Sequence, residues 1–223
     1  MNEWTDSSGK ALTDYPRPSV AVDVAVLTYS DAALKMLVVK HQLGKFALPG
    51  TFLHERELLT AAADRALRSK AGMVNAEFHQ LAILDNPNRD DRGWVLSVAH
   101  AAALPESDVP VDATLLDAYG ALDLAFDHAE IVGLAVADLR SRYAEAVDPA
   151  GLLGDTFTVP QLRQLYEVVF DRELQKDSFR RHVVDALIST GEYVRAATGR
   201  PAEMYRRSPG ATLPPQALVF LTG

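Results

Sequence analysis

Basic side chains gather near the C-terminal end of the chain, where they could contact a polyanion. The segment 176–207 holds seven lysine and arginine residues and four acidic ones, whereas the 223-residue chain has a formal net charge of −8. Residues 1–150 carry 13 basic and 22 acidic side chains, and residues 151–223 carry 9 and 8. Such an asymmetry between two halves is a hint that one half contacts nucleic acid. A solvated helix face gives the same pattern, so the cluster needs a structural context.

The elements expected around this cluster have the order of a winged helix-turn-helix. Thr158 and Gln161 form a capping-box pair that begins one helix. Asp177 or Ser178 caps a second helix, and Gly191 is expected to end it. Two strands are expected to follow, at 192–196 and 202–207. In winged modules with this order, the second helix enters the major groove of DNA.

Other residues that could act in catalysis or bind a metal do not have the spacing that either role requires. The chain has no cysteine, which excludes disulfides, thiolate zinc sites and a cysteine nucleophile. Its six histidines never share a metal-binding spacing such as His-x-x-x-His. Asp90 and Asp91 lie in a polar loop where turn formation explains them, and Ser97 lacks the context of a nucleophile elbow. No metal site is therefore expected.

The first part of the chain predicts a sheet flanked by helices. Four valines between 20 and 26 alternate with smaller or polar residues, which is typical of a strand. Further strands are expected at 35–41, 46–50, 78–85 and 94–102, and helices at 57–71 and 128–146. Gly72 is a natural stop for the first helix.

The segment 48–73 resembles a Nudix box. Anchored on Gly72 and Met73, the box places Glu57 at the first glutamate and Arg65 at the arginine. The three remaining acids of the box are absent, because Ala66, Ser69 and Lys70 stand at their positions. Nudix hydrolysis uses clustered carboxylates to hold Mg²⁺ beside a pyrophosphate. One carboxylate cannot do this, so we expect a chain that is not an enzyme.

A wider set of motifs resembles the Nudix-related transcriptional regulators of NAD metabolism. In chain order these are 17–23, 48–50, 88–93 leading to Ser97, 126–128, 157–158, 165–167, 179–181, 199–202 and 205–206. The resemblance spans about 17 to 207 and implies an α+β chain. An N-terminal Nudix-like α/β/α sandwich with a mixed sheet would precede a C-terminal winged helix-turn-helix.

The resemblance also implies a function. Members are repressors that bind palindromic double-stranded operator DNA as homodimers and respond to ADP-ribose as an effector, with no cofactor required. This chain departs from the usual pattern at Thr51, where members carry a glycine, and at Phe46, often a tryptophan. Candidate effector contacts are Lys40, Phe46, Pro49, Gly50, Glu57 and Arg65. For Arg65, a salt bridge with Glu57 that braces the helix is an equal alternative.

The winged module carries the candidate DNA contacts. Arg180, Arg181 and His182 lie near the start of the second helix, whose early residues reach base edges. Arginine suits bidentate contact to guanine. Arg200 lies at the expected hairpin tip. Further candidates, mainly for phosphate, are Thr158, Lys176, Ser178, Tyr205 and Arg207.

We expect four segments: a flexible leader at 1–16, the Nudix-like domain at 17–150, the winged helix at 151–208 and a tail at 209–223. The tail is either ordered or disordered. No apolar signal core or membrane span is visible, so the chain is expected to be cytoplasmic. Two other functions stay open. One is an active Nudix pyrophosphatase with a regulatory C-terminal domain, and the other is a module whose winged helix binds a protein.

Overall fold

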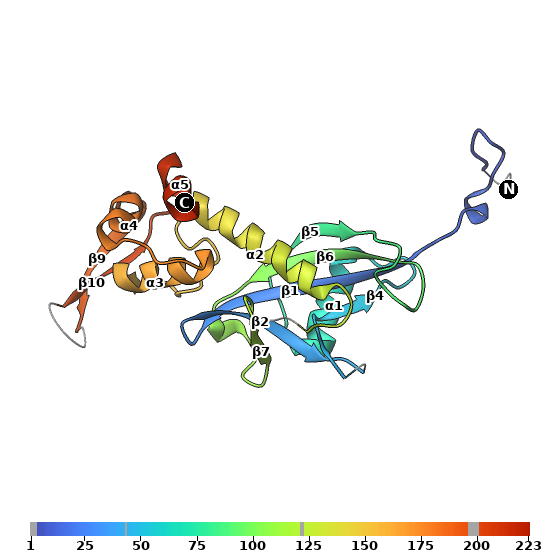
Figure 1. The fold of residues 1–223 in the computed structure, drawn as a ribbon, viewed down its shortest axis with the longest axis horizontal. Helices are drawn as coiled ribbons and strands as arrows, with labels where there is room; N and C mark the ends of the chain where they lie inside the picture. Colours follow the sequence, from blue (N-terminus) through green and yellow to red (C-terminus); the bar gives the residue numbers. More distant parts are fainter. Residues whose placement is uncertain (1–3, 43, 121–122, 196–200) are drawn as a thin grey trace.

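One long helix, α2 (His128–Glu145), joins two lobes in the computed structural model of the chain (Figure 1). The structure describes residues 4–42, 44–120, 123–195 and 201–223. The described residues ahead of β1, from residue 4, extend away from the first lobe as a thin arm (Figure 1). Within the described residues, every helix is too short or too polar to cross a membrane.

A seven-stranded mixed sheet forms the centre of the first lobe. Its strands are β1 (Ser19–Ser30), β2 (Ala33–Lys40), β3 (Phe46–Ala47), β4 (Gly50–Phe52), β5 (His79–Leu84), β6 (Val95–Ala103) and β7 (Thr114–Asp117). The order is β3-β2-β1-β6-β5, with β4 also paired to β1 and β7 to β2. β1 runs parallel to β6 but antiparallel to β2 and β4, which pair with different halves of it.

Helices cover both faces of this sheet because β1 is apolar on both sides. Val22, Val24 and Val26 belong to the cluster that packs against α1 (Leu59–Ala71). The alternate residues Ala25 and Leu27 belong to the cluster on the α2 side. The expected α/β/α sandwich with a mixed sheet is confirmed.

Most expected elements of the first lobe are found within a few residues of their predicted bounds. The segment expected at 46–50 instead contains β3 and the first residue of β4, which pair with different strands. Gly72 ends α1 in the left-handed region with φ of 66°, as its position predicts. Asp31 and Ala32 both have positive φ and form the tight turn between β1 and β2. β7 was not expected from the sequence and adds a strand to the outer side of β2.

The second lobe is a winged helix-turn-helix. It contains β8 (Phe157–Thr158), α3 (Val159–Phe170), α4 (Lys176–Val183), β9 (Leu187–Val194) and β10 (Ala202–Arg207). The predicted capping box is confirmed, since the Thr158 side chain accepts from the Gln161 N–H and the Gln161 side chain accepts from the Thr158 N–H. The three strands form a sheet in the order β8-β10-β9.

Two predictions in this lobe are wrong. Gln175 caps α4, two residues before Asp177 and three before Ser178, the predicted caps. The helix does not run to Gly191: it ends at Val183, and Gly191 lies inside β9 with φ of 75°. A glycine there signals strand irregularity as readily as a helix stop.

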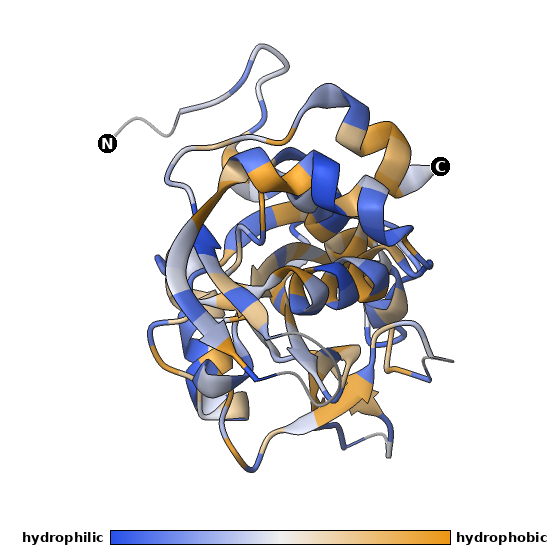
Figure 2. Cartoon of the chain, turned by 90° about the vertical axis from the view of Figure 1, so that its left-hand side faces the viewer, coloured by the Kyte–Doolittle hydropathy of each residue, from blue (hydrophilic) through white to orange (hydrophobic). Residues whose placement is uncertain are grey.

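The tail contains an ordered helix, α5 (Pro215–Thr222). Ala217 and Leu221 are buried against the shared core, and the Leu213 N–H donates to the Glu145 carbonyl at the end of α2. Figure 2, which views the winged-helix end, shows the apolar band of α5 beside the C-terminus. Between the two alternatives for the tail, the structure favours the ordered one.

Candidate functional site

A pocket of about 470 Å³ opens where β2 and β4 diverge along β1. The end of β2 contributes Lys40 to its wall, and the last turn of α1 contributes Lys70. Arg89 and Arg92 come from the loop between β5 and β6, and His128 begins α2. The pocket thus collects lysine, arginine and histidine side chains from four separate parts of the first lobe.

A buried carboxylate, Asp23 on β1, organises the floor of the pocket. The Ser97 hydroxyl donates to its Oδ2 over 2.5 Å, and His128 Nε2 lies 3.4 Å from its Oδ1. The Leu48 N–H donates to His128 Nδ1 over 2.9 Å, so the ring carries its proton on the nitrogen that faces Asp23. Burial alone would raise the pKa of Asp23, but the His128 and Ser97 hydrogen bonds and the Arg89 charge bring that pKa below its ordinary value. Asp23 is therefore a fixed, ionised anchor.

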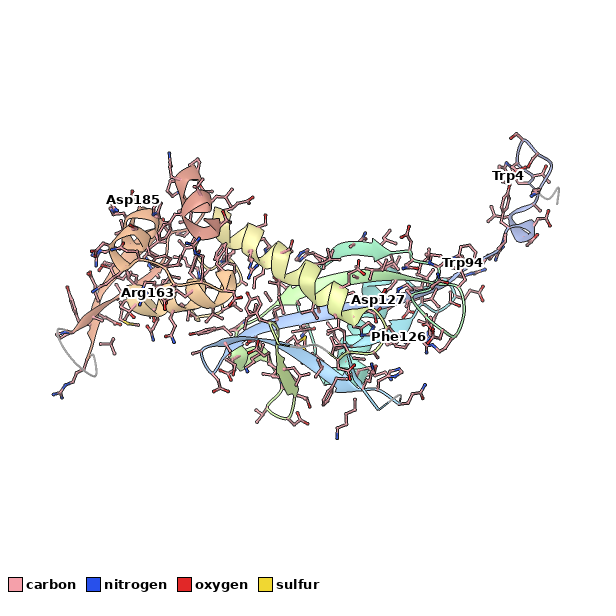
Figure 3. The ribbon with its side chains drawn as sticks, in the orientation of Figure 1. Trp4, Trp94, Phe126, Asp127, Arg163 and Asp185 are labelled. Carbon is pink, nitrogen blue, oxygen red and sulfur yellow. The ribbon has the colours of Figure 1, made fainter. Side chains whose placement is uncertain are left out.

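Two bidentate arginine–carboxylate pairs hold the pocket rim. Arg89 donates to both oxygens of Asp127 over 2.8 and 2.6 Å, which ties the β5–β6 loop to the start of α2. Arg92 donates to both oxygens of Asp90 over 2.9 and 2.6 Å, and its guanidinium lies 4.8 Å from the Phe126 ring centroid. Figure 3 shows Phe126 and Asp127 at the pocket end of α2. Paired in this way, the rim is rigid before any ligand arrives.

The pairing of β4 with β1 explains why the predicted pocket residue Gly50 is a glycine. Gly50 pairs with Asp23 across the two strands, and a Cβ on Gly50 would lie 2.0 Å from Asp23 Oδ1. Only glycine leaves room for the carboxylate, so Gly50 belongs to the pocket through its missing side chain.

Glu57 and Arg65 form a brace beside the pocket. Arg65 donates to both Glu57 oxygens over 2.8 Å, to Thr51 Oγ1 over 2.9 Å and to the Phe52 carbonyl over 2.9 Å. The Arg65 hydrogen bonds lower the pKa of Glu57 to about 2. Neither side chain lines the pocket. The geometry matches the alternative in which this pair braces the helix.

Of the other predicted effector contacts, two line the pocket and two do not. Lys40 and Gly50 line the pocket. Phe46 packs against the core on the α2 side, and the Pro49 carbonyl accepts from the Val24 N–H over 2.9 Å. Neither of these two lines the pocket. Several lining residues had no predicted pocket role, among them Asp23, Lys70, Arg89, Arg92, Phe126 and His128. Several of them lie in the motifs that carry the family resemblance. Those motifs were the feature of the sequence from which a pocket role could have been predicted.

The recognition helix of the winged lobe, α4, presents cations to solvent. Phe179 and Val183 are buried, whereas Lys176, Arg180 and Arg181 are exposed. These three side chains form no salt bridge with a carboxylate in the described ranges. Arg163 of α3 (Figure 3) lines a groove of about 560 Å³ between α3, α4 and the wing, together with Lys176 and Arg180. Exposed cations in such a groove suit a polyanion.

The remaining DNA candidates of the sequence have other partners. Thr158 and Tyr205 are buried, and the Tyr205 hydroxyl donates to Glu203 over 2.6 Å. His182 stacks on Phe220 of α5, with ring centroids 4.8 Å apart. Ser178 is half-buried and accepts from Arg181 over 3.1 Å. Arg200 lies outside the described residues.

Arg207 joins the winged lobe to the end of α2. Its guanidinium forms a salt bridge with Asp148 and donates to the Asp148 carbonyl over 2.9 Å. Asp148 is fully buried, and it accepts from the Tyr143 hydroxyl over 2.5 Å and from the Leu152 N–H over 2.8 Å. A buried, fully paired carboxylate of this kind locks three segments together. This favours a structural role for Arg207 over a phosphate contact.

A Nudix-like sandwich with a polar pocket, joined by one helix to a winged helix, defines a class of transcription regulator with a ligand-binding domain. Comparisons with known proteins agree. The family model for the NrtR DNA-binding winged helix domain matches residues 149–207. The chain is 31% identical over 210 residues to the ADPR responsive transcriptional repressor NtrR of Acinetobacter baylyi, covering 87% of this chain and 84% of the relative.

Solved structures give the same result. Shewanella oneidensis NrtR in complex with a 27mer DNA is 31% identical, with a TM-score of 0.70, and the match covers 90% of this chain and 96% of that one. The Nudix domain of the same protein, complexed with ADP ribose, is 28% identical with a TM-score of 0.51, covering 59% and 95%. The chain belongs to this family of Nudix-related transcriptional regulators.

Proposed function

We propose that this chain is a transcriptional repressor that binds operator DNA through α4 and the wing, and responds to ADP-ribose in the first-lobe pocket. The observation that carries the proposal is the course of α2. Its first residue, His128, lines the pocket, and Tyr143 near its other end is buried in the core of the winged lobe. One rigid helix therefore links ligand site and DNA-binding module.

The pocket chemistry supports ADP-ribose. Its diphosphate is anionic, and the wall carries Lys40, Lys70, Arg89 and Arg92. Phe52 and Phe126 add aromatic faces that suit a base or ribose. A relative is named as responsive to ADPR, and the Nudix domain of another was solved with ADP ribose.

DNA binding rests on the exposed face of α4. Arg180 and Arg181 read bases, Lys176 contacts phosphate, and Arg200 at the wing is retained as a predicted contact. Two copies bind one palindromic operator as a two-fold dimer, with half-sites about 10–10.5 base pairs apart or a multiple of that. Target genes serve NAD biosynthesis or salvage, and the protein acts in the cytoplasm.

The first lobe does not hydrolyse its ligand. Ala66 is buried in the core, and Ser69 and Lys70 occupy the other two glutamate positions of the box. The remaining box glutamate, Glu57, is held by Arg65 outside the pocket. ADP-ribose incubated with Mg²⁺ or Mn²⁺ should show no turnover above a buffer blank. Turnover that Glu57→Gln abolishes would favour the pyrophosphatase alternative.

A footprinting titration tests the function directly. The probes are DNA upstream of this gene and its neighbours, with a scrambled duplex as control. A protected, pseudo-palindromic segment bound by two copies supports the repressor. Absence of binding to upstream DNA at micromolar protein would contradict it and favour a winged helix that binds protein.

A further inference from the structure

Lys70 stands at a position where the Nudix box has a glutamate, and it faces the same pocket as Lys40. Lys70 lies in the last turn of α1 and Lys40 at the end of β2. Both lysines also line a second hollow of about 280 Å³, bounded by β2, the end of α1 and the segment around Asp112. The two lysines thus line both hollows, which adjoin at these residues.

These lysines differ from the other charges of the pocket. Asp23, Asp90, Arg89 and Arg92 are all engaged in ion pairs within the lobe. Neither lysine side chain has a hydrogen bond or an ion pair with any residue that the structure describes. Two unpaired cations beside a hollow match a ligand with two negative charges, and an ammonium offers three donors to phosphate oxygens.

The Mg²⁺ that the Nudix fold implies does not fit this site. Mg²⁺ binds through carboxylates and phosphate oxygens in near-octahedral geometry. The pocket's two carboxylates already accept from cations or a hydroxyl, Asp23 from Ser97 and Asp90 from Arg92. Two lysine charges at the pocket wall would repel a divalent cation.

We propose that Lys40 and Lys70 clamp the diphosphate of a nucleoside diphosphate ligand directly, in the place of a metal, so that effector binding is metal-independent. The proposal rests on the proposed function, since it assigns how the effector's diphosphate is held. The lysine pair bridges the two hollows, so a ligand with groups on both sides of its diphosphate can occupy both. ADP-ribose has that form.

Calorimetric titration of the full chain tests this, with ADP-ribose, ADP and inorganic pyrophosphate as ligands, each in EDTA and in Mg²⁺. The variants are Lys70→Gln and Lys40→Gln, and the matched control is Arg68→Gln, an exposed cation on α1 that lines neither hollow. We expect ADP-ribose to bind equally in EDTA and Mg²⁺. Each lysine variant should weaken it about 10-fold or more, the scale of a charge-assisted hydrogen bond, with Arg68→Gln unchanged.

Each contrary result has a distinct meaning. Binding that requires Mg²⁺, or wild-type affinity in both lysine variants, would overturn the clamp and leave the effector proposal intact. Binding of ADP in EDTA that depends on both lysines, without binding of ADP-ribose, would support the clamp and contradict the proposed effector.

Discussion

The two ends of helix α2 use charged side chains in opposite ways. Beside its first turn, the Arg89 side chain of the β5–β6 loop is almost fully buried and bound to Asp127, and the half-exposed Arg92 of the same loop is bound to Asp90. In the winged lobe at its other end, Arg180 and Arg181 of α4 lie exposed without a salt bridge to any described carboxylate. Residue type alone does not separate these groups. Pairing with a carboxylate does: the paired arginines of the first set shape a pocket, and the second set is available to a polyanion.

Asp148 is a buried carboxylate that forms a salt bridge at the winged-lobe end of α2, so this end also contains a paired charge. It links Tyr143 of α2 to Arg207 of β10. The Asp148→Ala variant leaves the Arg207 guanidinium and the Tyr143 hydroxyl without this partner, so we expect a loss of about 3–5 kcal/mol in the free energy of unfolding. Urea denaturation measures it. Asp155→Ala, an exposed acid in the same loop, should change stability by less than about 0.5 kcal/mol.

Gly50→Ala tests the pairing at the pocket end. The new methyl would meet Asp23 Oδ1, and we expect about 1–3 kcal/mol of destabilisation together with weaker ADP-ribose binding. Gly133→Ala is the matched control, because Gly133 lies inside α2 with open space around its Cβ position. It should stabilise the chain by about 0.5–1 kcal/mol. A wild-type thermal midpoint for Gly50→Ala would disprove the close approach.

Arg181→Ala tests the exposed set. If Arg181 reads a base, the variant should lose about 1–3 kcal/mol of operator affinity, with thermal stability unchanged. Fluorescence anisotropy at fixed salt measures the affinity, and Arg68→Ala on the first lobe is the control. Wild-type affinity in both Arg181→Ala and Arg180→Ala would mean that the DNA surface lies elsewhere.

The smallest effect concerns pH. Because the pKa of Glu57 falls from 4.5 to about 2 on folding, its ionised form stabilises the native state above about pH 4.5. That contribution is lost as the pH falls from 4.5 towards 2. The thermal midpoint of wild type should exceed that of Glu57→Gln at pH 7, and the gap should narrow at pH 3. An unchanged gap would place the carboxylate outside the brace with Arg65.

The sequence predicted the fold well, because periodicity and local signals are short-range. The valine alternation of β1, the glycine stop after α1 and the capping box at Thr158 all depend on neighbouring residues. The pocket depends on contacts between residues far apart in the chain, such as Asp23 with His128 and Arg89 with Asp127. No local pattern encodes those distances.

The same limit applies to the basic cluster at 176–207. Its charge count drew attention to the winged lobe but could not separate Arg181, which is exposed, from Arg207, which is bound to Asp148. For Arg65, the box pattern left ligand contact and brace equally open, and four hydrogen bonds in the folded chain distinguish them.

The central claim is that pocket and winged helix are coupled through α2. Titration of operator DNA with and without saturating ADP-ribose, paired with titration of ADP-ribose with and without operator DNA, measures that coupling. We predict that each ligand shifts the affinity of the other by the same factor, corresponding to about 1–3 kcal/mol. Identical DNA-binding curves in the presence and absence of bound ADP-ribose would contradict the account.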